Sequence, residues 1–438
     1  MRVALVFLGA AACNSILGNS DFTGPGSHVD ACTSATCVDG MPDGMPDASM
    51  TCQNMGKPPT TITGKIFAPN GSLPLPNVLV YVPKNTPDAL PTGVQCGCTP
   101  ATGTALTSAI TDANGNFQLT DPPTGPNVPI VIQLGKWRRQ ITLANVDACA
   151  DNGLPTGSNR LPRNHTEGDM PSIAIATGAA DELECLIRRV GIDDTEIGSN
   201  GDGRKVQLFS GFQPGANMFA AGYPGGAGTF GMAASNLTDP TKLETFDRVM
   251  FSCEGSPANI SQSQAVAITD WANKGGQLLL EHYERVWMVM SPSWMPLATF
   301  MDANPPPSPS NVTIDQTFPK GNLLVTWLSN IGAGTGGTIP VINPRNTVMT
   351  ADQNQVQVWA HLDPAQRMGL TGDQIFTFAT PLGVPQGQQC GRVIFSDMHQ
   401  NGQGGTGVAF PNECPAQALT PQEDVLAFLF FDEQTCLQ

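Results

Sequence analysis

The chain has 438 residues, too many for one compact core, and 40% of them are hydrophobic, so at least two globular domains are expected. Only 13% are charged, and 47 glycines and 38 prolines favour turn-rich, β-containing structure over long charged helices. The net charge of −16 argues against nucleic acid as a partner, because phosphate binding needs a surface rich in Lys and Arg.

Residues 1–12 are typical of a signal peptide. A single Arg2 precedes the short apolar run of residues 3–9, which is well below the roughly 20 residues that a membrane span needs. Three alanines then stand directly before Cys13. This arrangement resembles the lipobox of bacterial lipoproteins, although Ala10 stands where leucine is commonest. The resemblance implies a lipid on Cys13 that anchors the chain to a membrane of the cell envelope, on the periplasmic or cell-surface side. Ordinary secretion is the alternative.

Residues 13–59 are poor in large apolar side chains and carry an Asp/Gly/Met/Pro near-repeat at 39–47, which predicts a flexible tether. The twelve cysteines of the chain lack repeated zinc-type pairs and indicate an oxidising compartment with several disulfides. We expect Cys32, Cys37 and Cys52 to form small local loops within the tether. If Cys13 is lipidated, eleven thiols remain, so at least one cysteine is free or is paired between chains.

Residues 60–145 contain short β-branched runs at 62–68, 78–82, 117–119 and 130–134, separated by Asn/Gly/Asp turns, and predict a small antiparallel β-sandwich. The opening Thr63-Gly64-Lys65-Ile66, followed by residues 75–80 and 111–117, resembles the carboxypeptidase regulatory-like (transthyretin-like) domain. That resemblance implies an accessory domain without catalytic activity.

After a linker at 146–170, strands and helices alternate through residues 171–438. The expected strands are residues 172–177, 206–209, 248–252, 277–282 and 391–396. The expected helices are 181–190, one from the Ser261/Gln264 capping box to Lys274, and a last one that begins at Thr420-Pro421. Together with the sandwich, this alternation predicts a multidomain protein whose larger part is a flavodoxin-like, doubly wound α/β domain with a mostly parallel sheet.

Residues 246–251, 275–282 and 391–399 resemble the class I glutamine amidotransferase-like fold, and within it the ThuA-like branch. For residues 291–389 we identify no resemblance to a family. Amidotransferases carry a nucleophilic cysteine at the sharp turn after the strand that here spans residues 278–281, but this chain has Glu281-His282-Tyr283 at that turn. The resemblance therefore implies no glutaminase activity, and it marks His282 and His399 as the positions that match.

Ligands of doubly wound sheets bind outside the carboxyl ends of the strands, where several polar side chains of this sequence fall. A thiol beside an imidazole can be an activated nucleophile, so Cys253 and His282 are a candidate catalytic pair. The remaining candidates are assigned to ligand binding: Glu254, Tyr283, Trp287, Asp397 and His399. Tyr283 and Trp287 are four residues apart and could stack on a sugar or pack against the following helix.

Two imidazoles with a carboxylate also form a plausible transition-metal set, here His282 and His399 with Glu254 or Asp397. No other cofactor is expected. In the simplest alternative, each of these groups only forms hydrogen bonds within its own loop. We also expect a disulfide between Cys390 and Cys414 that clamps the glycine-rich loop 401–407.

The favoured interpretation is an envelope lipoprotein that binds a small polar or glycan ligand and is not an enzyme. The alternatives are a hydrolase that uses Cys253 with His282 or a His282/His399 metal, and a purely structural or adhesive envelope component.

Overall fold

The structure, a computed structural model, describes residues 52–96, 105–400 and 407–432, all within one compact unit that spans residues 47–437. The predicted signal peptide, the lipidated Cys13, most of the tether, Cys32 and Cys37 lie outside the described residues. Among the described residues no helix has the length and apolar character that a membrane crossing requires.

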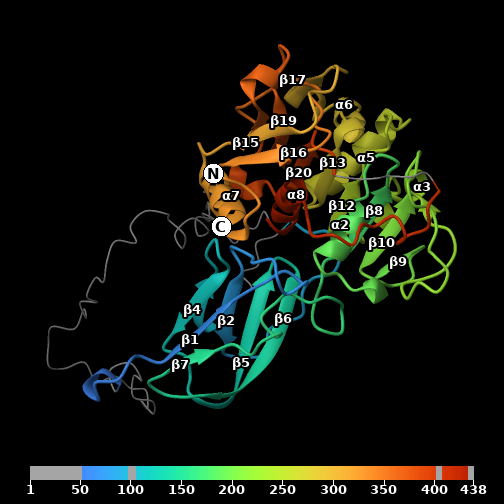
Figure 1. The fold of residues 1–438 in the computed structure, drawn as a ribbon. Helices are drawn as coiled ribbons and strands as arrows, with labels where there is room; N and C mark the ends of the chain where they lie inside the picture. Colours follow the sequence, from blue (N-terminus) through green and yellow to red (C-terminus); the bar gives the residue numbers. More distant parts are fainter. Residues whose placement is uncertain (1–51, 97–104, 401–406, 433–438) are drawn as a thin grey trace, which may run out of the picture. The chain divides into compact units, whose positions relative to one another are not determined.

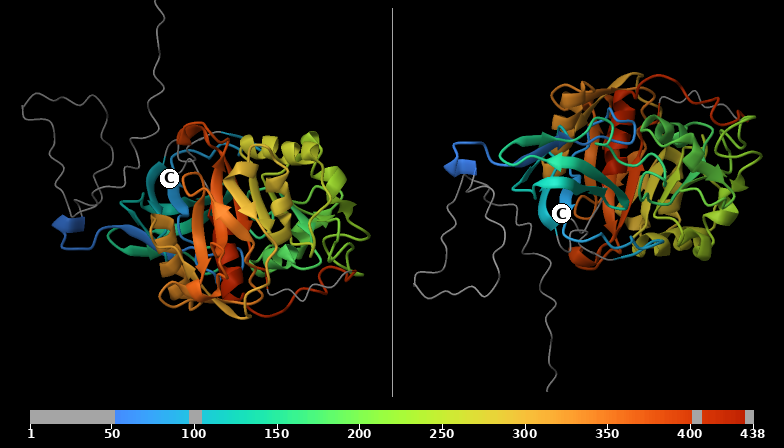
Figure 2. Two further views of the ribbon diagram at one scale, coloured as in Figure 1. Left: turned by 90° about the horizontal axis from the view of Figure 1, so that it is seen from above. Right: turned by 90° about the horizontal axis from the view of Figure 1, so that it is seen from below.

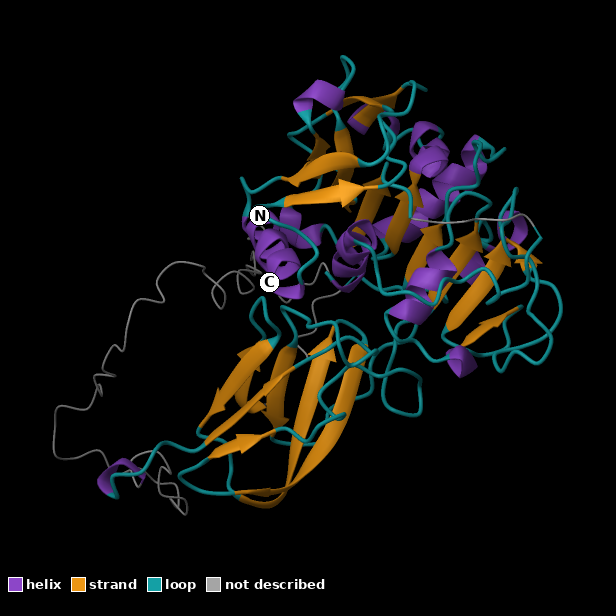
Figure 3. Ribbon diagram, viewed as in Figure 1, coloured by secondary structure: helices purple, strands orange, loops and turns teal. Residues whose placement is uncertain are grey.

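The N-terminal part of the described chain consists of two sheets (Figures 1 and 3). The first sheet has the strand order β4 (Asn116–Thr120), β1 (Thr61–Lys65) and β7 (Asp151–Gly153). The second has the order β3 (Ala105–Ile110), β2 (Leu79–Pro83), β5 (Gly125–Leu134) and β6 (Trp137–Val146). Alternate side chains of both sheets, among them Ile62, Leu119 and Ile132, are buried in one hydrophobic cluster, so this part is a two-sheet sandwich.

One strand of the sandwich lies in the segment that was expected to be a linker. β7 pairs parallel with β1 rather than antiparallel, and it follows directly after Cys149, which is disulfide-bonded to Cys52. The disulfide fixes this segment beside the start of β1, so residues 151–153 can add a strand to the sheet.

The largest sheet has eleven strands and includes a parallel block (Figure 1). The block has the order β10 (Val206–Ser210), β8 (Ile173–Thr177), β12 (Arg248–Phe251), β13 (Gln277–Glu281) and β20 (Gly391–Ser396). Two short strands, β9 (Ile197–Ser199) and β11 (Gly231–Met232), pair parallel with β10.

An antiparallel extension continues this sheet from β20. It has the order β19 (Asp373–Thr380), β18 (Gln357–Leu362), β15 (Ser310–Ile314) and β16 (Thr338–Val341). A separate pair consists of β14 (Ala298–Phe300) and β17 (Val348–Ala351). All of these strands come from residues 291–389, for which the sequence suggested no family. The expectation of several sheets with mixed α/β structure is confirmed, but the sheet is parallel in only part of its width.

Helices cover both faces of the parallel block (Figure 2). Ile173 and Ile175 of β8 pack in one cluster with α2 (Leu183–Arg189) and α8 (Pro421–Phe431). Ala174 and Ala176 point the other way, into a cluster with α5 (Gln262–Asn273). Both predicted capping boxes are present, at Ser261/Gln264 and at Thr420/Glu423. Further helices of the described residues are α3 (Ala233–Asn236), α4 (Pro240–Leu243), α6 (Val286–Val289) and α7 (Pro319–Ile331).

Short 3₁₀ turns complete the described structure: η1 (Asp194–Glu196), η2 (His282–Arg285), η3 (Met295–Leu297), η4 (Pro364–Gln366) and η5 (Gln386–Gln388).

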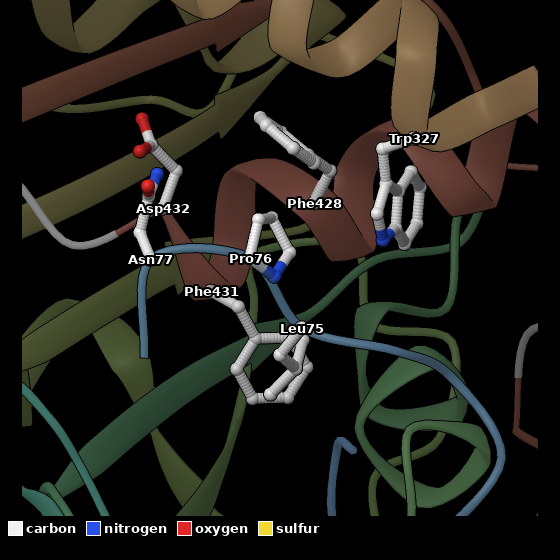
Figure 4. Close-up of a pocket in the computed structure, with 7 residues that line it drawn as sticks. All are labelled: Leu75, Pro76, Asn77, Trp327, Phe428, Phe431 and Asp432. Carbon is white, nitrogen blue, oxygen red and sulfur yellow. The ribbon is translucent and has the colours of Figure 1, made fainter. Parts of the chain in front are cut away.

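Aromatic side chains join the sandwich to the helices of the large sheet. The indole of Trp137, which is fully buried, lies 5.9 Å from the ring of Phe431, centroid to centroid. Trp327 Nε1 donates to the carbonyl of Pro74 at 2.7 Å. The pocket drawn in Figure 4 lies beside these contacts and has room for about one water molecule at most, so it is part of the packing and not a ligand site.

Three disulfides are present in the described part of the chain: Cys52–Cys149, Cys96–Cys390 and Cys185–Cys414. The prediction of a Cys390–Cys414 bond is therefore wrong, as is the local pairing of Cys52. Cys390 stands at the amino end of β20, whereas Cys414 follows the carboxyl end and bonds to α2. The six residues of β20 separate the two edges by roughly 20 Å, about three times the Cα spacing that a disulfide tolerates.

Replacement of the Cys96–Cys390 disulfide, as Cys96→Ser/Cys390→Ser, is expected to lower the free energy of unfolding by about 2–5 kcal/mol. The bond closes a loop of 294 residues, so its loss frees a large part of the unfolded chain. Urea denaturation of the double variant and the parent, both under non-reducing conditions, measures the difference. Equal stability of the two proteins would contradict the assignment.

Candidate functional site

The candidate site lies at the carboxyl edge of the parallel block. Asp181 follows β8, Cys253 follows β12, His282 follows β13 and His399 follows β20. Parallel strands end at the same edge, so four residues spread over more than two hundred positions come together there. The chain passes from β8 outward to β10 on one side and to β12 on the other, and such a reversal of strand order is where ligands bind in α/β sheets.

Three side chains with metal-ligand chemistry meet at this edge. Cys253 Sγ lies 3.5 Å from His282 Nδ1, and the rings of His282 and His399 cross at a centroid distance of 5.0 Å. One ligand atom from each of the three residues lies within 4.8 Å of the other two. All three side chains are buried. The structure thus brings together Cys253, His282 and His399, as the sequence predicted.

His282 also has an unusual backbone conformation, with φ of +39° at the turn from β13 into η2. A non-glycine residue is rarely found in this left-handed region, and such strain is concentrated at functional sites. The turn directs the imidazole toward Cys253 and His399.

Hydrogen bonds fix the tautomer of His399. Its Nδ1 lies 2.6 Å from Asp181 Oδ2, and its Nε2 accepts from Arg345 Nε at 3.1 Å. The guanidinium can only donate, so the lone pair is on Nε2 and the proton of the neutral ring is on Nδ1, where Asp181 accepts it.

Burial keeps the two imidazoles neutral at pH 7. It lowers the pKa of His399 to about 4, with help from the charge of Arg345. Burial also lowers the pKa of His282 to about 2, with further contributions from His399, Arg285 and Arg345. A neutral imidazole has a free lone pair, which is the form that binds a metal ion.

Cys253 is a free, buried cysteine. Burial raises the pKa of its thiol well above the ordinary value, and the nearby charge of Asp181 raises it further. A protonated thiol beside a neutral imidazole is not the thiolate–imidazolium pair of an activated nucleophile.

Both predicted carboxylates form hydrogen bonds that stabilise the fold and do not contact the imidazoles or the thiol of the site. Glu254 accepts hydrogen bonds from the backbone amides of Phe212 and Gln213, at 2.9 and 2.8 Å. Asp397 accepts from the amide and the hydroxyl of Thr347. Both therefore hold neighbouring loops against the sheet edge.

The two predicted aromatic residues differ in their surroundings. The ring of Tyr283 lies against His282 at a centroid distance of 4.0 Å and is partly exposed, so it borders the site. Trp287 is buried against Phe251 at 4.7 Å, and its Nε1 donates to Glu284. Of the two roles expected for Trp287, stacking on a sugar or packing within the protein, the structure shows packing, because the indole has no exposed face for a sugar.

Sequence reasoning missed two residues of the site, Asp181 and Arg345. In the sequence, Asp181 is the first residue of the expected helix 181–190, and its place after the first strand of the block is a usable signal. Arg345 comes from the unmatched segment 291–389, so no sequence signal connected it with His399.

Buried carboxylates surround the site. Glu184 and Glu281 are fully buried, and none of their side-chain oxygens has a hydrogen-bond partner within the described residues. Burial raises the pKa of both well above the ordinary value, and neighbouring carboxylates add to this effect. Burial raises the pKa of Glu413 to about 7, and burial together with the charge of Glu413 raises that of Glu182 to about 7.

No family model and no curated protein matches this chain. The solved structures that are similar to this chain include two interface mutants of the type II cohesin–X-dockerin complex from Acetivibrio cellulolyticus. The N-terminal interface mutant shares 20% identity over 28% of this chain and 78% of that chain, with a TM-score of 0.17. The C-terminal interface mutant shares 19% identity over 34% of this chain and 88% of that chain, also with a TM-score of 0.17. At this TM-score neither likeness supports a conclusion about fold or function.

The buried carboxylates predict that the protein loses stability as the pH rises from about 4.5 to 7. In this window the folded state keeps protons that the unfolded chain has already released, because pKa values near 4.5 are raised to about 7 at Glu182 and Glu413. The free energy of unfolding is expected to fall over this window, as urea denaturation at pH 4.5, 6 and 7.5 would measure.

The variant Glu184→Gln should flatten this decline, since it removes one carboxyl that stays protonated in the folded state and ionises in the unfolded chain. Compared with the parent at the same pH, the variant should therefore be relatively more stable at pH 7.5 than at pH 4.5. Glu244→Gln, which changes an exposed carboxylate, serves as the control and should keep the parental slope. A parental stability that rises between pH 4.5 and 7 would refute the assignment of raised pKa values.

Proposed function

We propose that this protein is an exported, lipid-anchored component of the cell envelope whose α/β domain binds a transition-metal ion of the zinc class through Cys253, His282 and His399. The observation that carries this proposal is the convergence of one thiol and two neutral imidazoles within 4.8 Å at the edge of the sheet. A sulfur and two nitrogens are ligands that zinc and neighbouring transition metals prefer.

The spacing of the donor atoms fits a tetrahedral ion. With Zn–S of about 2.3 Å and Zn–N of about 2.0–2.1 Å, two tetrahedral ligands should lie about 3.6 Å apart. Cys253 Sγ and His282 Nδ1 are 3.5 Å apart. Three protein ligands leave a fourth position for water or another ligand, so a bound ion would supply Lewis-acid chemistry there.

Asp181 supplies the support that metal-binding histidines usually have. A ligating imidazole commonly donates its second ring N–H to a carboxylate, which fixes the ring and raises the basicity of the ligand nitrogen. The contact between His399 Nδ1 and Asp181 has this form, at 2.6 Å.

The assignment to a fold is part of the same proposal. The parallel order β10-β8-β12-β13-β20 corresponds to 2-1-3-4-5 in chain order, which is the flavodoxin-like order and supports a relationship to the ThuA-like branch. His282 occupies the strained turn where amidotransferases carry cysteine, which supports a relative without glutaminase activity. The sandwich is proposed as the carboxypeptidase regulatory-like accessory domain. Export and anchoring rest on residues 1–13 and on the disulfides.

The Cys253/His282 nucleophile is the weaker alternative, because burial favours the neutral forms of both groups. A small polar or glycan ligand is compatible with the metal proposal, since the fourth position of the ion lies at the ligand-binding edge of the sheet.

Titration of the full chain with Co²⁺ tests the metal site directly. We expect one equivalent to bind and to produce a thiolate-to-cobalt charge-transfer absorption, because Cys253 is deprotonated when it ligates an ion. Cys253→Ser should abolish this absorption, and His282→Ala or His399→Ala should weaken binding. His165→Ala, which changes an exposed histidine outside the site, is the control. An absorption that persists in Cys253→Ser, or a chain that binds no Co²⁺, would overturn the proposal.

Asp181→Asn should lower the metal affinity by about 10–100-fold, because His399 loses the carboxylate that orients it. The matched control is Glu196→Gln, which alters a second carboxylate–histidine contact of 2.6 Å, at His165. That control should keep the parental affinity. If Asp181→Asn binds Co²⁺ as tightly as the parent while remaining folded, the role of Asp181 is disproved.

A further inference from the structure

A half-buried arginine stands beside the proposed metal site without a carboxylate partner. Arg345 donates its Nε to His399 Nε2 at 3.1 Å and forms no ion pair within the described residues. Several other arginines of this acidic chain are paired with carboxylates: Arg188 with Asp194, Arg189 with Glu423 and Arg392 with Asp432. Arg345 therefore contacts His399 without forming an ion pair, although its charge also acts on the Asp181 carboxyl on the other side of that ring.

The backbone of Arg345 is fixed in place. Its amide donates to the carbonyl of Asp397 at 3.0 Å, and its carbonyl accepts from Gln374 Nε2 at 2.6 Å. Asp397 also accepts from the amide of Thr347, two residues further along the chain. The segment is thus held against the end of β20, and only the side chain of Arg345 is free to change partners.

Arg345 and a metal ion compete for the same lone pair. Nδ1 of His399 carries the proton that Asp181 accepts, so Nε2 is the nitrogen that remains for an ion. Arg345 Nε already donates a hydrogen bond to this Nε2. When an ion takes that lone pair, the guanidinium must move away from Nε2 while its backbone stays in place. Two cations so close together repel each other, unless an anion lies between them.

The chemistry of the guanidinium indicates which anion fits. Its planar fork binds carboxylates and phosphates with two parallel hydrogen bonds. Most side chains at this edge are buried, and burying a second negative charge costs further solvation free energy, so a monoanion fits better than a dianion such as phosphate. Tyr283 and Arg345, the two partly exposed side chains that contact the histidines, mark the side from which a small molecule would enter.

We infer that Arg345 binds the carboxylate of a small organic acid that also occupies the fourth position of the metal ion. This inference rests on the proposed function and names the class of its ligand. Metal and carboxylate binding are then coupled, so each strengthens the binding of the other by the same factor.

The experiment measures the Co²⁺ dissociation constant of the full chain, at controlled free Co²⁺, with and without acetate as the probe. In the parent, acetate should tighten Co²⁺ binding at least about tenfold, the effect expected for a charge-assisted bidentate contact. Arg345→Gln should bind Co²⁺ at least as tightly as the parent without acetate, because the competing cation is gone, but it should lose the acetate effect. Arg345→Lys should retain part of it.

Arg367→Gln is the matched control, since Arg367 is also half-buried but donates to the carbonyl of Leu362. It should behave as the parent does. An equal acetate effect in the parent and in Arg345→Gln would overturn the inference, as would tightening by inorganic phosphate but not by acetate. A parent that binds no Co²⁺ would show instead that the metal proposal has failed, and this inference would fail with it.

Discussion

The constraint on which the structure depends is that the five strands of the parallel block end at one edge of the sheet. Side chains that follow β8, β12, β13 and β20 are brought together at that edge, although they are spread from Asp181 to His399. The antiparallel extension and the sandwich pack around this block, and two disulfides, Cys96–Cys390 and Cys185–Cys414, link distant segments near its two edges. The position of the site is therefore a consequence of topology, and its chemistry depends on which residues occupy the strand ends.

Burial determines the charge state of those residues. The imidazoles of His282 and His399 stay neutral, the thiol of Cys253 stays protonated, and carboxyls such as Glu281 resist ionisation, all because the charged forms are poorly solvated inside the protein. At neutral pH these buried acids lower the free energy of unfolding. The fold tolerates this loss because disulfides also stabilise it. A cation placed among these groups would be favoured by their lone pairs and by the negative charge that they can acquire.

Much of the architecture could be predicted from local sequence patterns. Apolar runs, capping boxes and turn residues are short-range signals, and they correctly indicated the strands of the parallel block and the starts of α5 and α8. The arrangement of segment 291–389 could not be predicted, because its antiparallel strands carry no family signature. The Cys390–Cys414 prediction failed because proximity in sequence says little about which edge of a sheet a residue reaches.

Part of the site could also be predicted from short-range sequence patterns. Cys253, His282 and His399 were found because each directly follows a recognisable strand. Trp287 was misjudged, since spacing along the chain does not distinguish a buried indole from an exposed one. Arg345 could not be found, because its contact with His399 joins the block to the unmatched segment through tertiary packing alone.

The most direct test of the metal site is X-ray absorption spectroscopy at the zinc K-edge on the zinc-loaded chain. A centre formed by Cys253, His282 and His399 predicts one sulfur scatterer at about 2.3 Å and two imidazole nitrogens at about 2.0–2.1 Å, with a lighter fourth ligand. A first shell made only of oxygen and nitrogen, with no sulfur, would show that the ion binds elsewhere and would contradict the account.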